Sequence, residues 1–271
     1  MGIGEFFGYG FIQRALLAGS CIALLCSLLG VLLVLRRLSL IGDGLAHVTF
    51  GSVALGLLLR LHPLSISIPV VMASSLGILK LTEKARLFGD AAIGIVSAVG
   101  IACGIILASV AGGFNVDLFS YLFGNILSIS SGEVLTAMVV SSLAVVIIIC
   151  FYNDLLSVSF DEEFAKTSGI DTSRINTILV LLTAVTVSLA MKVVGIMLTS
   201  ALLILPAVTS LQIAKGFKHT MVLALVIAVI SVVCGICISF LLNLPAGATV
   251  VLVNFLFFLG ALTLNRVFLK K

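Results

Sequence analysis

The chain has 271 residues, of which 61% are hydrophobic and only 10% are charged, and its mean hydropathy is +1.37. Soluble domains carry roughly 25% charged residues, so this composition excludes an ordinary soluble protein and indicates a polytopic membrane protein in contact with lipid. The formal net charge of +4 is small and dispersed over short loops, which argues against a nucleic-acid partner.

Apolar runs of about 20 residues, the length that crosses a bilayer as a helix, recur along the whole chain. We therefore predict an all-α fold with a single transmembrane domain over residues 1–271 and about nine transmembrane helices. The predicted spans are 12–35, 40–59, 63–81, 91–112, 132–151, 175–193, 195–213, 220–242 and 246–264. Only Lys192 and Gly195 separate the sixth span from the seventh, so eight helices is the alternative.

Lysine and arginine gather in alternate loops. They follow the first, third, fifth, seventh and ninth spans, at Arg36, Arg37, Lys80, Lys84, Arg86, Lys166, Arg174, Lys215, Lys218, Arg266, Lys270 and Lys271. Because basic loops stay in the cytoplasm, we predict that the N-terminus is outside and the C-terminus is cytoplasmic. No basic segment precedes the first apolar run, so we expect no cleavable signal peptide.

Asp43 and His47 lie four residues apart within the second span. Residues at this spacing share one face of a helix, where a carboxylate oxygen and an imidazole nitrogen can bind one small cation. Ionisable groups inside a membrane usually mark an ion or proton path. The alternative is structural: Asp43 caps the helix or pairs with Arg36 or Arg37, and His47 bonds to a neighbouring helix. Small residues around the pair favour close helix contact, which both interpretations allow.

Two side chains do not complete a zinc site, which usually has four ligands. The others could come from a symmetry-related copy, from water, or from Thr199, Ser200 or Asn254 in later spans. Such polar groups more often form hydrogen bonds between helices. Cys234 and Cys237 form an isolated CxxC inside an apolar run, which is typical of small packing residues rather than a metal or redox site.

Two loops are longer than the others. Loop 113–131 is predicted to lie outside, along the outer surface. Segment 153–174 is predicted to be cytoplasmic and holds five of the chain's eleven acidic residues. Ser159 followed by acids predicts a helix start, and Gly169 predicts its stop. We therefore expect a short cytosolic helix of about two turns that docks another protein.

The sequence lacks the motifs of common enzymes. It has no GxxxxGK[ST] phosphate loop, no dinucleotide fingerprint, no HExxH and no GxSxG. We therefore predict that the chain is not an enzyme and holds no permanent cofactor. The energy for active transport would come from a partner or from an ion gradient.

The run Arg36-Arg37-Leu-Ser-Leu-Ile-Gly-Asp43-Gly-Leu-Ala-His47 resembles the signature of the permease subunit of bacterial zinc, manganese and iron-chelate ABC importers. Further stretches resemble the same family in the expected order over nearly the whole chain. They are Asp90–Val96, Leu122–Leu127, Phe160–Gly169, Gly195–Ala207 and Pro245–Thr249.

This resemblance implies a homodimeric permease in the bacterial inner membrane. It also implies a cytosolic ATP-binding subunit and an extracytoplasmic metal-binding protein as partners. Asp43 and His47 match the residues expected to contact the transported metal. The positions matching the ATPase-coupling segment are Phe160, Asp161, Glu162, Glu163 and Gly169.

The form Asp-Gly-Leu-Ala-His looks more like the zinc-type members, and residues 48–51 lack the Leu-Pro-Gly common in manganese-type members. We therefore expect Zn²⁺ as cargo, with Mn²⁺ or iron as the alternative. One rival is a proton-driven secondary metal transporter that uses Asp43 and His47 as a relay, although such transporters usually show internal repeats and none is clear here. The other is a non-transporting membrane protein in which the pair only fastens helices.

Overall fold

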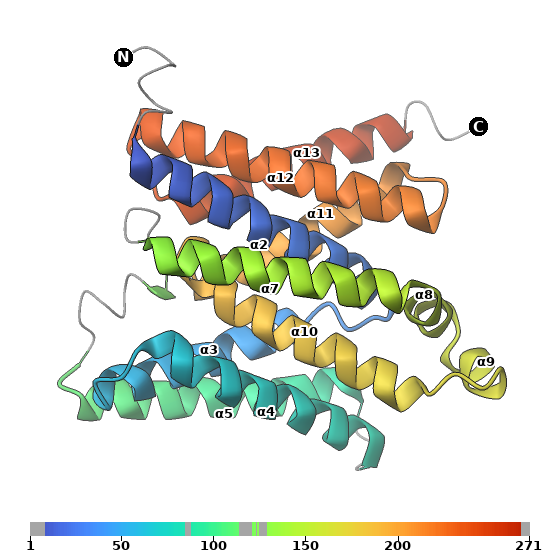
Figure 1. Ribbon diagram of the computed structural model, residues 1–271, viewed down its shortest axis with the longest axis horizontal. Coiled ribbons are helices and arrows are strands. Elements are labelled where there is room, and N and C mark those ends of the chain that lie inside the picture. The colour runs from blue at the N-terminus through green and yellow to red at the C-terminus, as the bar shows by residue number, and fades with distance from the viewer. Residues whose placement is uncertain (1–8, 85–87, 114–120, 123, 125–128, 267–271) are drawn as a thin grey trace.

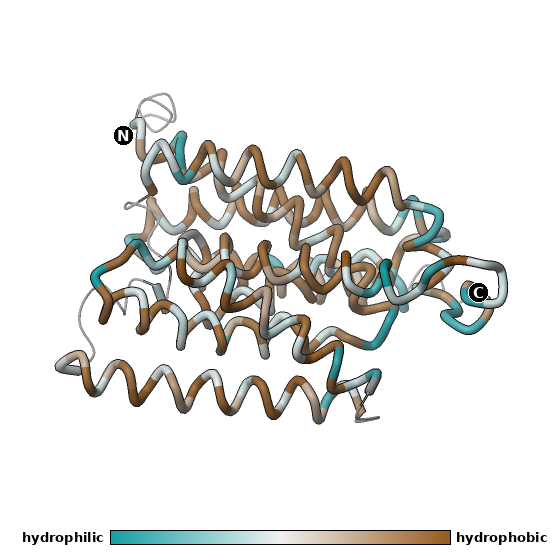
Figure 2. The backbone as a smooth tube through the Cα atoms, turned by 60° about the horizontal axis from the view of Figure 1, so that its bottom comes forward, coloured by the Kyte–Doolittle hydropathy of each residue, from teal (hydrophilic) through white to brown (hydrophobic). Residues whose placement is uncertain are grey.

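The computed structural model describes residues 9–84, 88–113, 121–122, 124 and 129–266. In these ranges every regular element is a helix, and the long helices lie side by side in one bundle (Figure 1). Hydrophilic positions concentrate at the two ends of the bundle, and hydrophobic positions fill its length (Figure 2). This arrangement confirms the predicted all-α polytopic membrane fold.

Within the described ranges, eight helices are long and apolar enough to cross a membrane. They are α2 (Gly10–Leu35), α3 (Ile41–Leu58), α4 (Pro63–Lys84), α5 (Gly89–Val110), α7 (Ser131–Cys150), α10 (Thr172–Val193), α12 (Phe217–Leu242) and α13 (Ala246–Leu264). A further apolar helix, α11 (Thr199–Ile213), has only 15 residues.

Helix α11 stands where the seventh span was predicted. Gly195 adopts a left-handed conformation with φ 92°, and the 3-10 turn η2 (Ile196–Leu198) follows it, so the regular helix begins four residues later than predicted. Helix α2 begins at one end of the bundle and α13 finishes at the opposite end (Figure 1). An odd number of crossings produces this arrangement, so α11 acts as a short ninth crossing.

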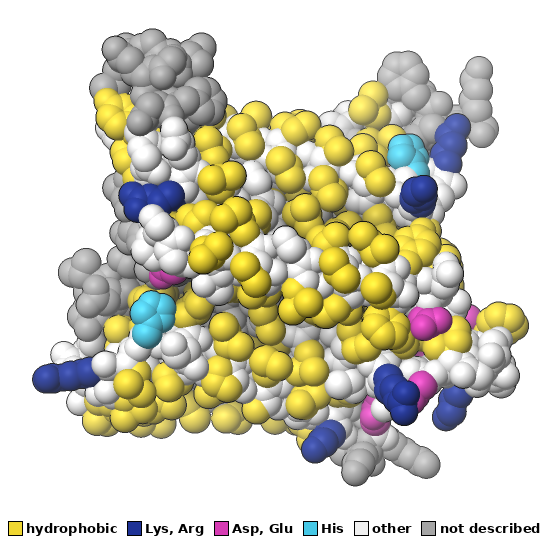
Figure 3. All heavy atoms as spheres, in the orientation of Figure 1, with side chains coloured by type: hydrophobic (Ala, Val, Ile, Leu, Met, Phe, Trp, Pro, Cys, Tyr) yellow, Lys and Arg dark blue, Asp and Glu magenta, His cyan; other side chains and the backbone are white. Residues whose placement is uncertain are grey.

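The centre of the bundle is formed by α2, α3 and α10. In the most apolar 18-residue stretch of each helix, 72% of the residues of α2, 72% of those of α3 and 67% of those of α10 are buried. The same share is 22% for α4 and for α5. The outer helices turn apolar side chains such as Val99 and Val139 outward, and a hydrophobic band covers the visible face between charged ends (Figure 3). Lipid can cover such a face, because the helical backbone satisfies its own hydrogen bonds.

Glycines allow α3 and α5 to approach closely. A Cβ atom on Gly51 would lie 2.8 Å from the carbonyl oxygen of Gly100, and one on Gly100 would lie 2.9 Å from the Cα of Val48. No larger side chain fits at either position without moving a helix. The prediction of close helix contact around Asp43 and His47 is therefore confirmed.

A short helix is present in segment 153–174, as predicted, but its start was predicted at the wrong residue. Helix α8 (Tyr152–Phe160) continues almost directly from α7 and buries Ser159. The short α9 (Glu162–Thr167) is capped by Asp161, whose side chain accepts a hydrogen bond from the Phe164 amide at 2.9 Å. Asp161 has the extended backbone that capping needs, whereas Ser159 is inside a helix. Gly169, with φ 87°, follows the end of α9 as predicted.

Loop 113–131 lies largely outside the described residues. Its last part forms the start of α7, where Ser130 and Glu133 make a reciprocal capping box. Helix α7 therefore begins at Ser131, one residue before the predicted span.

Candidate metal site

Helix α3 begins well inside the bundle rather than at the end where α2 finishes (Figure 1). Arg37, with φ 57°, terminates α2, and the chain up to Leu40 leads inward to the start of α3. Asp43 lies in the first turn of α3, where the helix dipole favours a negative charge. His47 lies one turn further along.

The two side chains face each other, as their spacing predicts. The Nε2 atom of His47 is 3.4 Å from Oδ2 of Asp43, and the side chains are 22% and 49% exposed in the single chain. The other carboxylate oxygen, Oδ1, accepts a hydrogen bond of 3.1 Å from the hydroxyl of Ser200 on α11. Asp43, His47 and Ser200, which we call the inner polar cluster, thus bring a nitrogen and several oxygens together.

Glycines on both sides of Asp43 position the inner polar cluster. A Cβ on Gly42 would lie 2.5 Å from Cδ1 of Leu203 on α11, and one on Gly44 would lie 2.7 Å from Cγ2 of Ile93 on α5. The Gly-Asp-Gly sequence therefore lets α11 and α5 pack on either side of the carboxylate. The close approach of α11 is what brings Ser200 within hydrogen-bonding distance.

The separation of the two facing atoms suits a tetrahedral ion. If one ion formed bonds of about 2.1 Å to both Nε2 of His47 and Oδ2 of Asp43, the observed 3.4 Å would subtend an angle of about 108°. Octahedral coordination at the same bond length would need the two atoms about 3.0 Å apart. The pair can therefore hold a small divalent cation without a large change in side-chain position.

The described residues contain no group of three or more histidine, cysteine, aspartate or glutamate side chains that could hold a metal. Of the three polar candidates from later spans, only Ser200 reaches the pair. Thr199 donates a hydrogen bond to the Gly195 carbonyl at 2.8 Å, and the Asn254 amide donates to the Val250 carbonyl at 3.2 Å. A complete coordination sphere needs water or a second copy of the chain.

The proposed pairing of Asp43 with Arg36 is wrong. The guanidinium of Arg36 instead donates from Nη2 to Oε2 of Glu162 on α9 at 3.0 Å. Burial of Arg36 lowers its pKa, and the nearby Glu162 carboxylate counteracts this effect. Oε1 of Glu162 accepts a second hydrogen bond, of 2.9 Å, from the Asn176 amide on α10. Asn176 was missed in the sequence, where only its polarity near the start of an apolar span distinguishes it.

The rest of segment 153–174 around α9 has exposed aromatic and acidic side chains. Phe160 and Phe164 are 67% and 66% exposed, and Asp161 and Glu163 are exposed beside them. Helices α8 and α9 project at the end of the bundle where α2 finishes (Figure 1). We call Phe160, Asp161, Glu163 and Phe164 the docking surface. Glu162 differs from them because its carboxylate is bonded to the body of the protein.

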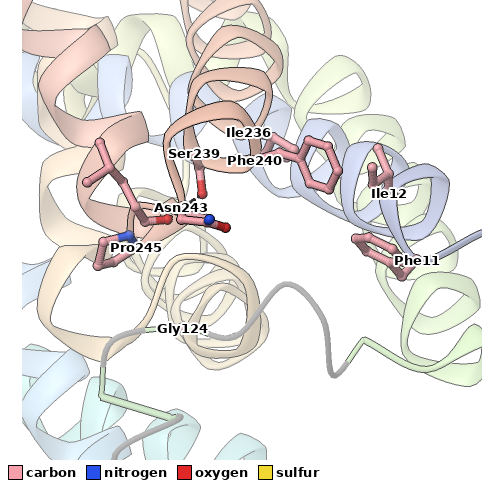
Figure 4. A pocket seen from close by; sticks show the side chains of 10 residues that line it. Phe11, Ile12, Gly124, Ile236, Ser239, Phe240, Asn243 and Pro245 are labelled. Atoms are coloured by element: carbon pink, nitrogen blue, oxygen red, sulfur yellow. Dashed lines mark hydrogen bonds between the residues drawn. The ribbon is translucent and has the colours of Figure 1, made fainter. Parts of the chain in front are cut away.

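A cavity of about 370 Å³ lies between the start of α2 and the α12–α13 turn (Figure 4). Aromatic and small side chains such as Phe11, Phe240 and Pro245 line it, and its polar groups include Ser239 and Asn243. No titratable side chain is among its lining residues. None of Asp43, His47 and Ser200 is among its lining residues, so the cavity is not part of the inner polar cluster.

The chain is similar to known membrane transport proteins over nearly its whole length. The family model described as ABC 3 transport family matches residues 8–265. A protein of Listeria innocua named manganese transport system membrane protein MntC is 34% identical, and the match covers 97% of this chain and 95% of that protein. The high-affinity zinc uptake system membrane protein ZnuB of Haemophilus influenzae is 29% identical, over 93% of this chain and 97% of that one. A solved structure of PsaBC from Streptococcus pneumoniae in complex with Fab is 31% identical, with a TM-score of 0.88 and 100% of both chains covered.

Proposed function

The chain belongs to the ABC 3 transport family and is the multi-pass membrane permease of an ABC metal importer, and from this premise we propose that Asp43 and His47 bind the metal ion as it crosses the membrane. The observation that carries this proposal is the 3.4 Å approach of the imidazole to the carboxylate, inside the bundle and on one helix face. A carboxylate and an imidazole are costly in a membrane interior and are usually functional there.

We further propose that two copies of the chain share the metal path. Within the described residues, one copy supplies only one carboxylate and one imidazole to the site. Two copies related by a two-fold axis would supply two of each, which is the four-ligand set that zinc prefers. Asp43 is 49% exposed in the single chain, so its carboxylate is accessible to a partner copy or to water.

Zinc is the proposed cargo. Imidazole is a favoured zinc ligand, and the 3.4 Å separation lets one small divalent cation contact both side chains. Manganese is the second candidate, because a relative named for manganese transport is 34% identical while one named for zinc uptake is 29% identical. Both ions would use the same pair of side chains.

ATP hydrolysis is proposed to occur in a separate cytosolic subunit that binds the docking surface. Exposed aromatic side chains such as Phe160 and Phe164 can fill pockets on a partner, and adjacent carboxylates can orient it. An extracytoplasmic metal-binding protein is proposed to deliver the ion. ATP-driven movement of α9 would then shift the permease between two states that open to opposite sides.

The test is uptake of radioactive zinc and manganese by cells that lack their own high-affinity importers. The cells would express the permease with its genomic-neighbour ATPase and binding protein. We expect His47→Ala and Asp43→Asn to abolish uptake while membrane blots show unchanged expression. His219→Ala is the matched control, because His219 is exposed at the start of α12, away from the inner polar cluster.

The outcomes separate the alternatives. Uptake that needs the ATPase and disappears in His47→Ala supports the proposal, and the preferred ion identifies the cargo. Undiminished uptake by a well-expressed His47→Ala would show that His47 is not needed for transport and serves helix packing instead. Uptake without the ATPase would favour a proton-driven transporter.

A further inference from the structure

Glu162 connects three elements that are distant in the sequence. It is the first residue of α9, and its two carboxylate oxygens are bonded to Arg36 at the end of α2 and to Asn176 in α10, at 3.0 and 2.9 Å. The side chains of the two partners are poorly accessible: Arg36 is 9% exposed and Asn176 is buried. The Glu162 side chain is 46% exposed, so its loss would leave Arg36 and Asn176 without this partner in a poorly accessible place, whereas loss of Arg36 would leave Glu162 in contact with water.

The bond between Glu162 and Arg36 lies close in sequence to the inner polar cluster. Arg36 follows the last residue of α2, and the next few residues run inward to the start of α3, which carries Asp43 in its first turn. The path from the guanidinium to the carboxylate therefore follows a short stretch of chain. A shift of Arg36 would be passed to the N-terminus of α3.

The bond between Glu162 and Asn176 involves the helix that precedes Ser200, the hydrogen-bond partner of Asp43. Asn176 belongs to α10, which is followed by Gly195, η2 and then α11. Ser200 on α11 donates the hydrogen bond to Asp43. Glu162 is thus bonded to α2 and α10, and the helices that follow these two in the chain, α3 and α11, make the Asp43–Ser200 contact.

We propose that the Arg36–Glu162–Asn176 cluster, which we call the joint, transmits movement of α9 to the inner polar cluster, so that Arg36, Glu162 and Asn176 are positioning residues for transport. This inference rests on the proposed function. It assigns Glu162 a role distinct from the docking surface: Phe160 and Phe164 face outward, whereas the Glu162 carboxylate is engaged by the permease itself. When the joint is lost, the ATPase still binds the permease and hydrolyses ATP, but its movement no longer reaches the inner polar cluster.

The experiment uses the complete importer in proteoliposomes and measures ATP hydrolysis and metal uptake in the same sample. The variants are Arg36→Gln, Glu162→Gln and the double variant. Arg174→Gln is the matched control, because Arg174 in the first turn of α10 makes a 2.7 Å ion pair with Asp171, the N-cap of that helix, and both side chains are exposed. Copurification of the ATPase shows whether docking is intact, and size-exclusion profiles show whether each variant is folded.

We expect each single variant to retain the ATPase and to lose about tenfold in metal transported per ATP hydrolysed, the scale of coupling effects between linked sites. Because Arg36 acts through its bond to Glu162, the double variant should lose about as much as Glu162→Gln alone, about tenfold rather than about a hundredfold. Arg174→Gln should stay within about twofold of the unmodified protein.

A second measurement follows the movement itself. Leu40, just before α3, is 49% exposed, so Leu40→Cys can be labelled in a protein whose six native cysteines have been replaced. We expect ATP to change the labelling rate by about threefold or more in the unmodified joint and to leave it nearly constant in Glu162→Gln.

Several results would overturn the proposal. They are unchanged transport per ATP in Glu162→Gln, a multiplicative loss in the double variant, or an ATP-dependent labelling change that survives the substitution. Loss of ATPase copurification would instead make Glu162 a docking residue. Absence of ATP-dependent uptake in the unmodified importer would refute the proposed function and is distinguishable from all of these.

Discussion

Gly100→Ala should weaken the packing of α3, the helix that carries Asp43 and His47. The new Cβ would lie 2.9 Å from both the Cα and the backbone nitrogen of Val48. Ordinary carbon contacts begin near 3.5 Å, so α3 and α5 would have to separate by about 0.6 Å. The obstruction is backbone and cannot rotate away, and overpacking of this kind costs about 1–3 kcal/mol. Val48 directly follows His47, so the same displacement should also reduce metal uptake.

Gly94→Ala is the matched control on the same helix. Gly94 is exposed, and a Cβ there would meet nothing within 4 Å. Replacement at Gly94 should therefore cost nothing in packing, and the helix-propensity gain of about 0.5–1 kcal/mol is common to both variants, which lie inside α5. In thermal unfolding in detergent, followed by fluorescence size-exclusion chromatography, we expect the apparent Tm of Gly100→Ala to be about 2–8 °C below that of Gly94→Ala. Equal Tm values and equal uptake for the two variants would refute the close-packing argument.

Three further substitutions test separate parts of the structure. Ser200→Ala removes the hydrogen bond to Asp43, worth about 1 kcal/mol, so the KM for metal uptake should rise about fivefold. Ser200→Thr keeps the hydroxyl and should restore the KM, whereas an unchanged KM in Ser200→Ala would show that Ser200 does not contribute to metal binding. Phe164→Ala should reduce ATPase copurification. The apparent Tm should change little, because substitution of an exposed residue usually alters stability by at most about 0.5 kcal/mol. A large decrease in Tm would instead show that Phe164 packs against the permease. Gly169→Ala forces an alanine to φ 87° in open space, so α9 should lose about 1–2 kcal/mol of local stability and show faster amide hydrogen exchange. Gly216→Ala, at an extended φ of −172° and also in open space, should not alter exchange in α9, and equal exchange in both variants would contradict the strain argument.

Much of the fold is local and was therefore predictable. A span appears wherever about 20 apolar residues follow one another, and the eight long helices agree with the predicted runs to within a few residues. The seventh span was harder, because the sequence does not show that Gly195 would take a left-handed conformation and delay the helix to Thr199. The start of α9 was misplaced because Ser159 and Asp161 are both good caps, and only the continuation of α8 through Ser159 selects Asp161.

Helix periodicity is enough to predict that Asp43 and His47 face each other, because it places residues four apart on one face whatever surrounds them. The partners of this pair and of its neighbours depend instead on contacts between distant parts of the chain. Ser200 is 157 residues from Asp43, and Glu162 is 126 residues from Arg36. Such contacts depend on how α3, α9, α10 and α11 pack, and packing is set by shape over many side chains at once. The local pattern therefore located the candidate metal ligands, while only the fold brought Arg36, Glu162 and Asn176 together.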